Sequence, residues 1–176
     1  MAEKENPMRK IRVEKLVLNM GCGTKLSIDV AKNLLERITG VGAVITKSHT
    51  RSTFNIPKGK PLGAKVTIRN GANEFLHRLL QARNKTLPES CFDATGNVSF
   101  GVKEYIDVPG VEYDPKIGNL GFDVCVTLER PGYRVKRKRI AHPVGHGHRI
   151  KPADAEEFMV KNFNVTIERK EKIEQQ

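Results

Sequence analysis

Two segments of the sequence carry positive charge and no negative charge. No acidic residue lies between Glu36 and Glu74 or between Glu129 and Asp154, and these two windows hold 15 of the 31 Lys and Arg residues. The rest of the chain holds 16 basic and 20 acidic residues, so the formal net charge of +11 is concentrated in the windows. Cations that neutralise phosphates release condensed counterions, which makes such clusters bind nucleic acid strongly at low salt. The windows therefore predict surfaces for a polyanion, and a folded RNA is favoured because its phosphates face several directions.

The second window is the denser of the two. Its densest cationic segment consists of Arg134, Lys136, Arg137, Lys138 and Arg139, joined by Arg149 and Lys151. An isolated basic run is often a solvated, disordered arm or a localisation signal. The first window, however, places further cations on a different element: Lys47, Arg51, Lys58, Lys60, Lys65 and Arg69. Two independent basic surfaces favour RNA binding, and we expect His148 to contact RNA together with the cations around it.

Three histidines in the second window, His142, His146 and His148, have a spacing that would suit a metal if the chain closed around it. The window contains no carboxylate to orient them, and the flanking cations would oppose a divalent ion. A metal-dependent enzyme is therefore a rival hypothesis only. Neither Cys91 nor Cys125 has an identifiable base partner, and no catalytic carboxylate pair stands out between residues 89 and 129. We expect no catalytic site, no metal and no cofactor.

The segment GCGTK, residues 21–25, lies between a predicted strand and a predicted helix. Its spacing does not match the phosphate-binding pattern G-x-x-x-x-G-K-[ST], so nucleotide hydrolysis is not predicted. Backbone amides at the start of a helix can hold an RNA phosphate. A tight turn that needs glycine for its backbone angles explains the segment equally well.

Phe54 and Tyr133 are the aromatic residues of the two basic windows. Exposed rings there would stack on unpaired bases, which is a common mode of RNA recognition. The alternative for each ring is that it caps the core at the root of its loop. The sequence leaves both possibilities open, with stacking more plausible for Phe54 than for Tyr133.

Hydrophobic periodicity predicts an α+β fold. Alternating apolar residues predict strands at 11–20, 41–47, 64–69, 97–102, 122–130 and 165–168, the first with a change of phase that suggests a bulge. Helical spacing predicts helices at 26–38, ended by Gly40, at 75–80, and at 153–163 after Pro152. This order indicates a mainly antiparallel sheet packed by helices on one face, with two long basic loops. We name these loops the basic hairpin (47–69) and the basic arm (131–151).

The length of 176 residues suits one domain, 1–176, with long functional loops. No segment approaches the roughly 18 apolar residues of a membrane span, and the N-terminus lacks the apolar stretch of a signal peptide. We therefore expect a cytosolic protein. The three cysteines, Cys22, Cys91 and Cys125, are odd in number and form no C-x-x-C pair, so we expect them to be reduced and mostly buried.

Several longer motifs occur in order between about Pro7 and Ile167. They are RKIRVEKLVLNMGCG, IPKGKPLGAKVTIR, FDATGNVSFGVKEYIDVPGVEYDPKIG, DVCVTLERPGYRVKRKR and HRIKPADAEEFM. Together they resemble the large-subunit ribosomal protein L5 family in its archaeal and eukaryotic form. Single pieces such as GNVSFG would be weak evidence alone, whereas the ordered combination is highly specific.

The resemblance implies a cytoplasmic ribosomal protein that binds 5S rRNA, attaches it to the central protuberance and also contacts 23S rRNA. It further implies contacts with P-site tRNA, with neighbouring large-subunit proteins and, through an inter-subunit bridge, with the small subunit. By motif, Asn19, Phe54 and Thr67 match the residues that recognise 5S rRNA, and we group with them the hairpin cations Lys47, Lys65 and Arg69. The segment that matches the tRNA contact is the hairpin tip, which consists of Asn55, Ile56, Pro57, Lys58, Gly59, Lys60 and Pro61. Arg134, Lys136, Arg137, Lys138, Arg139, His148 and Arg149 are then expected to contact other ribosomal RNA.

The sequence departs from the family pattern at Val41, where family members commonly carry Gln. A side-chain base contact at that position is therefore not expected from this chain. The basic arm resembles the family only in its charge, so its individual contacts are not carried over. A general RNA-binding module or chaperone outside the ribosome is the alternative function, and it would bind many RNAs with little preference.

Overall fold

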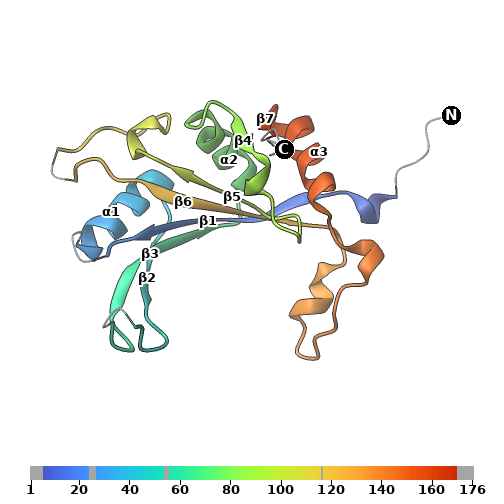
Figure 1. Cartoon of the computed structure of the whole chain (residues 1–176), viewed down its shortest axis with the longest axis horizontal. Coiled ribbons are helices and arrows are strands. Elements are labelled where there is room, and N and C mark those ends of the chain that lie inside the picture. Colours follow the sequence, from blue (N-terminus) through green and yellow to red (C-terminus); the bar gives the residue numbers. More distant parts are fainter. Residues whose placement is uncertain (1–5, 24–26, 54–55, 116, 170–176) are drawn as a thin grey trace, which may run out of the picture.

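The computed structural model describes residues 6–23, 27–53, 56–115 and 117–169. Five strands form one antiparallel sheet in the order β2-β3-β1-β6-β5: β1 (Arg12–Gly21), β2 (Val44–Lys47), β3 (Pro61–Ile68), β5 (Val98–Val102) and β6 (Phe122–Glu129). The helices are α1 (Ile28–Thr39), α2 (Ala72–Gln81) and α3 (Pro152–Phe163). The helices lie on one side of the sheet (Figure 1). The predicted α+β fold with a mainly antiparallel sheet is confirmed.

One face of the sheet forms the core with the helices. Alternate strand residues are buried, for example Leu16, Leu18 and Met20 on β1. The helices contribute buried residues at helical spacing, such as Leu34, Leu35 and Ile38 on α1 and Leu76, Leu79 and Leu80 on α2. Because strand side chains alternate between faces, the remaining strand residues belong to the opposite face, which no helix of the described residues covers (Figure 1). We call it the open face and define it by Lys15, Val17, Asn19, Lys65, Thr67, Ser99, Asp123, Cys125 and Thr127, which are exposed or half-buried.

The change of phase predicted in the first strand is a register shift between Val13 and Lys15 where β1 pairs with β6. On its other side β1 pairs with β3, and the two backbones approach closely at Gly63. A Cβ atom there would lie 2.2 Å from the Met20 carbonyl oxygen, so this position of the ladder requires glycine.

Strand β2 begins at Val44, later than the predicted start at residue 41, because the end of α1 captures the preceding amides. Gly40 ends the helix in the left-handed region. The Val41 amide then donates to Thr39 Oγ1 at 3.2 Å, and the Ala43 amide donates to Glu36 Oε1 at 2.9 Å. These amides are therefore unavailable for sheet pairing.

A second, small sheet was not predicted. Strand β4 (Thr86–Pro88) pairs in parallel with β7 (Thr166–Glu168), and the Thr166 amide donates to the Lys85 carbonyl at 2.8 Å. This pair joins the segment after α2 to the segment after α3. Three residues that end in proline show no alternation that would identify a strand.

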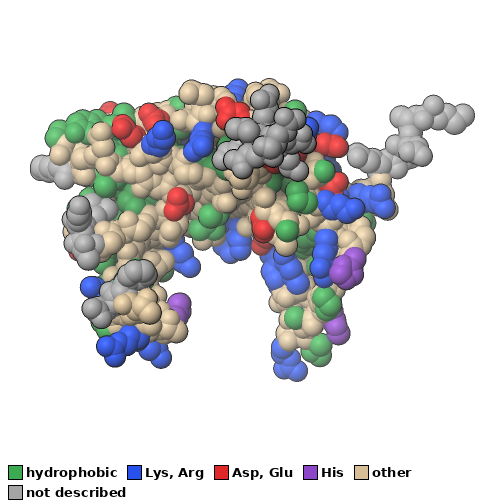
Figure 2. Space-filling view, in the orientation of Figure 1, with side chains coloured by type: hydrophobic (Ala, Val, Ile, Leu, Met, Phe, Trp, Pro, Cys, Tyr) green, Lys and Arg blue, Asp and Glu red, His purple; other side chains and the backbone are tan. Residues whose placement is uncertain are grey.

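Two projections extend from the sheet on the side away from α1 and α2 (Figure 1). One is the loop between β2 and β3, and the other is the basic arm between β6 and α3. Figure 2 shows Lys and Arg side chains at the ends of both projections. No helix in the described part of the chain is long and apolar enough to cross a membrane.

Candidate nucleic-acid interface

The open face brings together the polar residues that sequence motifs had singled out. Asn19 on β1 is the register partner of Lys65 on β3, and Thr67 is the partner of Val17. Asn19 and Thr67 therefore lie diagonally on neighbouring strands, which places their side chains within reach of one nucleic-acid segment. Lys65 is exposed, directly opposite Asn19 and two positions before Thr67 on β3. The arrangement combines hydrogen-bonding groups with a cation, which suits a nucleotide with its phosphate.

The hairpin tip presents its lysines on a tight turn. The Lys60 amide donates to the Pro57 carbonyl at 3.3 Å, and Gly59 between them has a φ of 85°, as the third position of a type II turn requires. The Gly59 amide also donates to the Ser48 carbonyl at 2.9 Å, which ties the turn to the other side of the loop. Lys58 and Lys60 are both exposed. Phe54 and Asn55, predicted to contact RNA and tRNA respectively, lie outside the described residues.

The root of the basic arm is anchored by Tyr133, which is 7% exposed and belongs to the core. Its hydroxyl accepts a hydrogen bond from the Ile150 amide at 2.9 Å and donates to the His148 carbonyl at 3.2 Å. The possibility that Tyr133 stacks on a base is therefore wrong, and the alternative of a core-capping ring is confirmed. The hydroxyl joins the two ends of the arm.

His148 and Arg130 reinforce the same root. His148 Nε2 lies 2.7 Å from the Pro131 carbonyl oxygen. Arg130 is nearly buried and donates to the Arg149 carbonyl at 3.3 Å and to Asp154 Oδ2 at 2.9 Å. Asp154 also accepts from the Lys151 amide at the start of α3. The expected RNA contact of His148 stays a prediction, although one of its ring nitrogens already has a partner.

Arg137 connects the basic arm to the sheet. Its guanidinium pairs with Glu14 at 2.7 Å and also contacts the nearly buried Glu129. Glu129 receives a second guanidinium from Arg12, at 2.6 Å. Two of the strand carboxylates thus hold the arm in place, and part of the charge of Arg137 is neutralised within the protein.

The other cations of the arm are exposed, although the Arg149 guanidinium also donates to the Val144 carbonyl at 3.0 Å. Arg134, Lys138 and Arg139 are exposed, and none of the three has an ion pair with a described residue. Lys136 lies 5.0 Å from the centre of the Tyr133 ring. Unpaired exposed cations are the groups that can neutralise phosphates. The arm is therefore an ordered projection with a cationic surface, rather than the disordered tail that its composition also allowed.

The histidines of the arm do not form a metal site. Across the described residues, no group of three or more His, Cys, Asp or Glu side chains converges in a way that would hold a metal ion. His142 and His146 are exposed, and His148 faces the Pro131 carbonyl. The rival hypothesis of an enzyme with a metal at these three histidines therefore finds no support in the geometry.

The segment 21–25 is described in part, since residues 24–26 lie outside the described ranges. Gly23 has a φ of 54°, in the left-handed region that favours glycine. This conformation supports the interpretation of a tight strand-to-helix turn.

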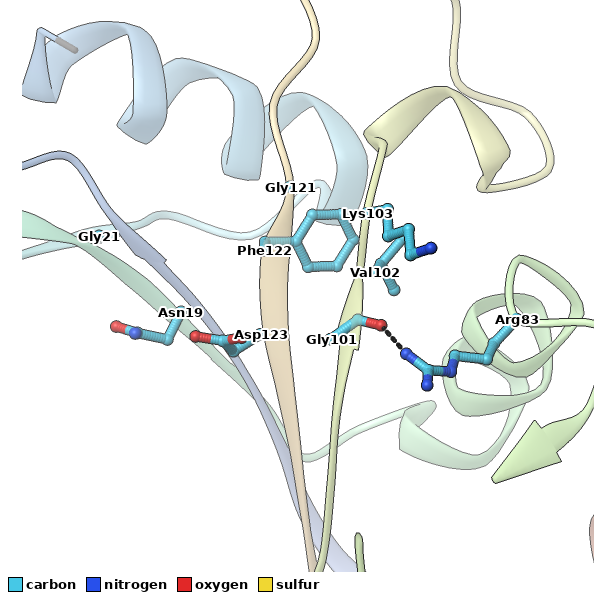
Figure 3. Close-up of a pocket in the computed structure, with 9 residues that line it drawn as sticks. All are labelled: Asn19, Gly21, Arg83, Gly101, Val102, Lys103, Gly121, Phe122 and Asp123. Carbon is cyan, nitrogen blue, oxygen red and sulfur yellow. Dashed lines mark hydrogen bonds between the residues drawn. The ribbon is translucent and has the colours of Figure 1, made fainter. Parts of the chain in front are cut away.

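A hollow of about 470 Å³ at the edge of the open face was not anticipated from the sequence. Figure 3 shows Asn19 and Asp123 extending to the same side, with Arg83 and Lys103 on the other side of β5. Asp123 is the register partner of Asn19, and Arg83 donates to the Gly101 carbonyl at 2.7 Å. The alternation in β6 could have identified Asp123 as a residue of the open face. Asp123 precedes the buried Val124, and successive strand residues lie on opposite faces.

Cys125 also lies on the open face and is exposed, so the prediction of mostly buried cysteines is wrong for this residue. Cys22 is buried and Cys91 is half-buried. Partial burial, and secondarily the neighbouring Asp123 carboxylate, raise the pKa of the Cys125 thiol above its ordinary value. The thiol therefore stays protonated to higher pH than a free cysteine does.

Comparison of the sequence with family models and with known proteins gives matches to one family. The family model "Ribosomal protein L5" matches residues 6–56, and a second model, for the C-terminus of the same ribosomal family, matches residues 61–146. The chain is 45% identical over 170 residues to the large ribosomal subunit protein uL5 of Sulfolobus acidocaldarius, covering 94% of this chain and 96% of that protein. It is 47% identical over 165 residues to uL5 of Cenarchaeum symbiosum (91% and 97% covered) and 44% identical over 169 residues to uL5 of Methanococcoides burtonii (93% and 99% covered).

Proposed function

The chain belongs to the ribosomal protein L5 family, and from that premise we propose that it binds 5S rRNA and attaches it to the central protuberance of the large ribosomal subunit. The family is a structural component of the cytoplasmic ribosome. We accordingly propose no catalytic activity and no cofactor. The whole chain, 1–176, acts as one RNA-binding domain in this proposal.

The observation that carries the proposal is the convergence of Asn19, Lys65 and Thr67 on the open face. Asn19 and Thr67 were assigned to 5S rRNA by motif alone, from parts of the sequence almost fifty residues apart. The sheet places them on adjacent strands, on the face that no helix covers, between two cationic projections. An RNA lying against this face would meet polar groups at its centre and cations at its sides.

The two projections have different roles in this proposal. The hairpin tip contacts P-site tRNA, and the exposed cations of the basic arm contact 23S rRNA. Lys47 at the end of β2 and Arg69 directly after β3 add to the 5S rRNA site. Surfaces outside these RNA contacts are left for neighbouring large-subunit proteins and for the bridge to the small subunit.

A competition experiment tests the proposal against a general RNA-binding module or chaperone. Labelled 5S rRNA is bound to the purified protein and challenged with unlabelled 5S rRNA or with an unrelated folded RNA of the same length. We expect only 5S rRNA to compete at stoichiometric amounts. Equal competition by both RNAs would favour the general module.

Replacing Lys58 and Lys60 by Ala is expected to affect tRNA more than 5S rRNA. The tip is tied to its own loop and lies at the far end of the projection, so its charges act away from the sheet. Binding of isolated 5S rRNA should stay within about threefold, while P-site tRNA retention on assembled ribosomes falls by roughly tenfold through lost charge-assisted contacts. Filter binding and tRNA release rates measure the two effects.

The matched variant removes two cations from the other projection, with Lys138 and Arg139 replaced by Ala. Arg137 is left intact because it holds the arm to Glu14 and Glu129. We expect this variant to retain tRNA once assembled but to enter the large subunit less efficiently. If the Lys58 and Lys60 variant loses 5S rRNA binding as severely as an Asn19→Ala variant does, the tip belongs to the 5S rRNA site and the proposed division between the projections is wrong.

Bound 5S rRNA is expected to protect Cys125 from alkylation. Cys125 is exposed on the open face, and the thiolate is the reactive form, so both coverage by RNA and the added negative potential slow the reaction. Because its pKa is raised, the Cys125 thiol of the free protein reacts only at higher pH than an ordinary cysteine, so the two rates are compared at one alkaline pH. Cys91, packed against the core elsewhere, is the internal control. An unchanged ratio of the two rates at saturating RNA would show that RNA does not cover the open face.

A further inference from the structure

The open face carries one feature that a phosphate-binding surface does not explain. Asp123 is exposed, and its carboxylate has no hydrogen bond or ion pair with any described residue. It is the single acidic residue in the set that defines the open face. A carboxylate here repels RNA phosphates and weakens binding unless it accepts hydrogen bonds from the RNA. The donors that RNA offers to a protein are ribose hydroxyls and the N–H groups of its bases.

The neighbour of Asp123 narrows the choice of base. Asn19 and Asp123 are register partners, so their Cβ atoms lie about 4.5–5.5 Å apart on the same face, close enough for one base edge to meet both. A carboxylate accepts two hydrogen bonds side by side, and the Asn19 amide nitrogen donates. Guanine is the base whose Watson–Crick edge presents two adjacent donors, N1–H and N2–H₂, beside an acceptor, O6. Adenine, cytosine and uracil each present a single donor position there.

We infer that Asn19 and Asp123 form a subsite for an unpaired guanine of the bound RNA. The carboxylate accepts from N1–H and N2–H₂, and the Asn19 amide donates to O6. This subsite deepens the proposed function and rests on it, because the guanine belongs to the RNA that lies on the open face.

The surroundings of the pair suit a nucleotide. Gly101 lies beside Asp123 on the edge strand, where an added Cβ would be 3.7 Å from Asp123 Oδ1, and a Cβ at Gly21 would meet nothing within 4 Å. The absence of side chains at both positions leaves the pair accessible from above. Arg83 and Lys103 line the same hollow from the other side of β5 (Figure 3), where they offer positive charge to the sugar-phosphate chain of the RNA at the edge of the sheet. The volume of about 470 Å³ is in the range of small-ligand sites.

Replacing Asp123 by Asn separates this inference from simple electrostatics, because the two predict opposite signs. Removing one negative charge from an RNA-binding surface should strengthen binding to any RNA. An amide at position 123 instead turns a donor toward the guanine donors, so we expect 5S rRNA affinity to fall by roughly tenfold, the effect of losing one bidentate base contact. Asp29→Asn, which removes the same charge from an exposed residue of α1 on the helix side of the sheet, is the matched control and should leave affinity unchanged or slightly raised. An increase in affinity for Asp123→Asn would overturn the guanine subsite.

Inosine substitution in 5S rRNA identifies the base. Inosine lacks the N2 amino group, so RNA carrying inosine at random guanine positions is bound to wild-type protein and to Asp123→Asn, and bound and unbound fractions are sequenced. We expect at least one unpaired position where inosine weakens wild-type binding by roughly fivefold or more and has little effect on the variant, since the shared interaction is already lost. Tight wild-type binding with no such position would overturn the subsite while leaving the proposed function intact. Failure of wild-type protein to bind 5S rRNA at all would overturn both.

Discussion

Raising the salt concentration from 50 to 200 mM should weaken 5S rRNA binding by roughly 10³-fold, if about six phosphates are contacted. The physical reason is the release of condensed counterions when cations of the protein neutralise phosphates. The structure supplies such cations in ordered positions, with Lys65 on the open face and Arg134, Lys138 and Arg139 exposed on the basic arm. The measurement is the equilibrium dissociation constant by filter binding at several potassium chloride concentrations, plotted as its logarithm against the logarithm of salt.

A pair of single variants links that slope to the open face. Lys65→Gln should reduce the slope by about one, because one phosphate contact is removed. Lys32→Gln, on α1 and therefore on the opposite side of the sheet, should leave the slope unchanged. A flat salt response of the wild-type protein would remove the electrostatic basis of the proposal. Equal slopes for Lys32→Gln and Lys65→Gln would instead place the RNA on another surface.

The elements that sequence reasoning predicted well are those with strong periodicity. The strand that became β6 alternates apolar and polar residues over its whole length, and α1 ends where Gly40 permits the left-handed conformation. Elements defined by pairing with distant segments were missed. Strand β4 exists because Thr86–Pro88 lies beside β7, and nothing within its own three residues indicates that partner.

The candidate site shows the same distinction. Charge patterning identified both projections, since acid-free windows are visible in the chain itself. The ordering of the basic arm was not visible, because it depends on Tyr133 bonding across the root to Ile150 and on Arg137 reaching Glu14. Composition describes how many cations a segment has, whereas tertiary contacts decide which of them remain available to RNA.

The position of Asp123 beside Asn19 required the register of β1 and β6. Each strand was predicted separately, and the alternation in 122–130 was used only to identify the buried residues, not to assign a role to Asp123. Only the pairing shows that its neighbour across the ladder is a residue already assigned to RNA by motif. Chemistry shared between two strands is therefore the part of an interface that single-strand patterns cannot reveal.

Replacing Asn19 and Thr67 by Ala should weaken 5S rRNA binding by about 1–3 kcal/mol each, if both side chains make direct polar contacts. Both are half-buried on the open face and belong to the central strands of the sheet, so the RNA is expected to approach them closely. The double variant should then lose on the order of 10²-fold or more in affinity. Filter binding measures the loss, and thermal unfolding shows whether the variants remain folded.

Whether the affinity losses of the Asn19→Ala and Thr67→Ala variants add up in the double variant shows whether the two side chains contact the same nucleotide. Asn19 and Thr67 are diagonal neighbours about 7–8 Å apart, a distance at which contacts with separate nucleotides should add and contacts with one shared nucleotide should not. The guanine subsite assigns Asn19 to a base that also meets Asp123, on the side away from Thr67. We therefore expect additivity within about 0.5 kcal/mol.

Asn33→Ala, an exposed change on α1, is the control and should leave affinity unchanged. Unchanged affinity in both single variants, with the fold intact, would show that the open face does not recognise 5S rRNA.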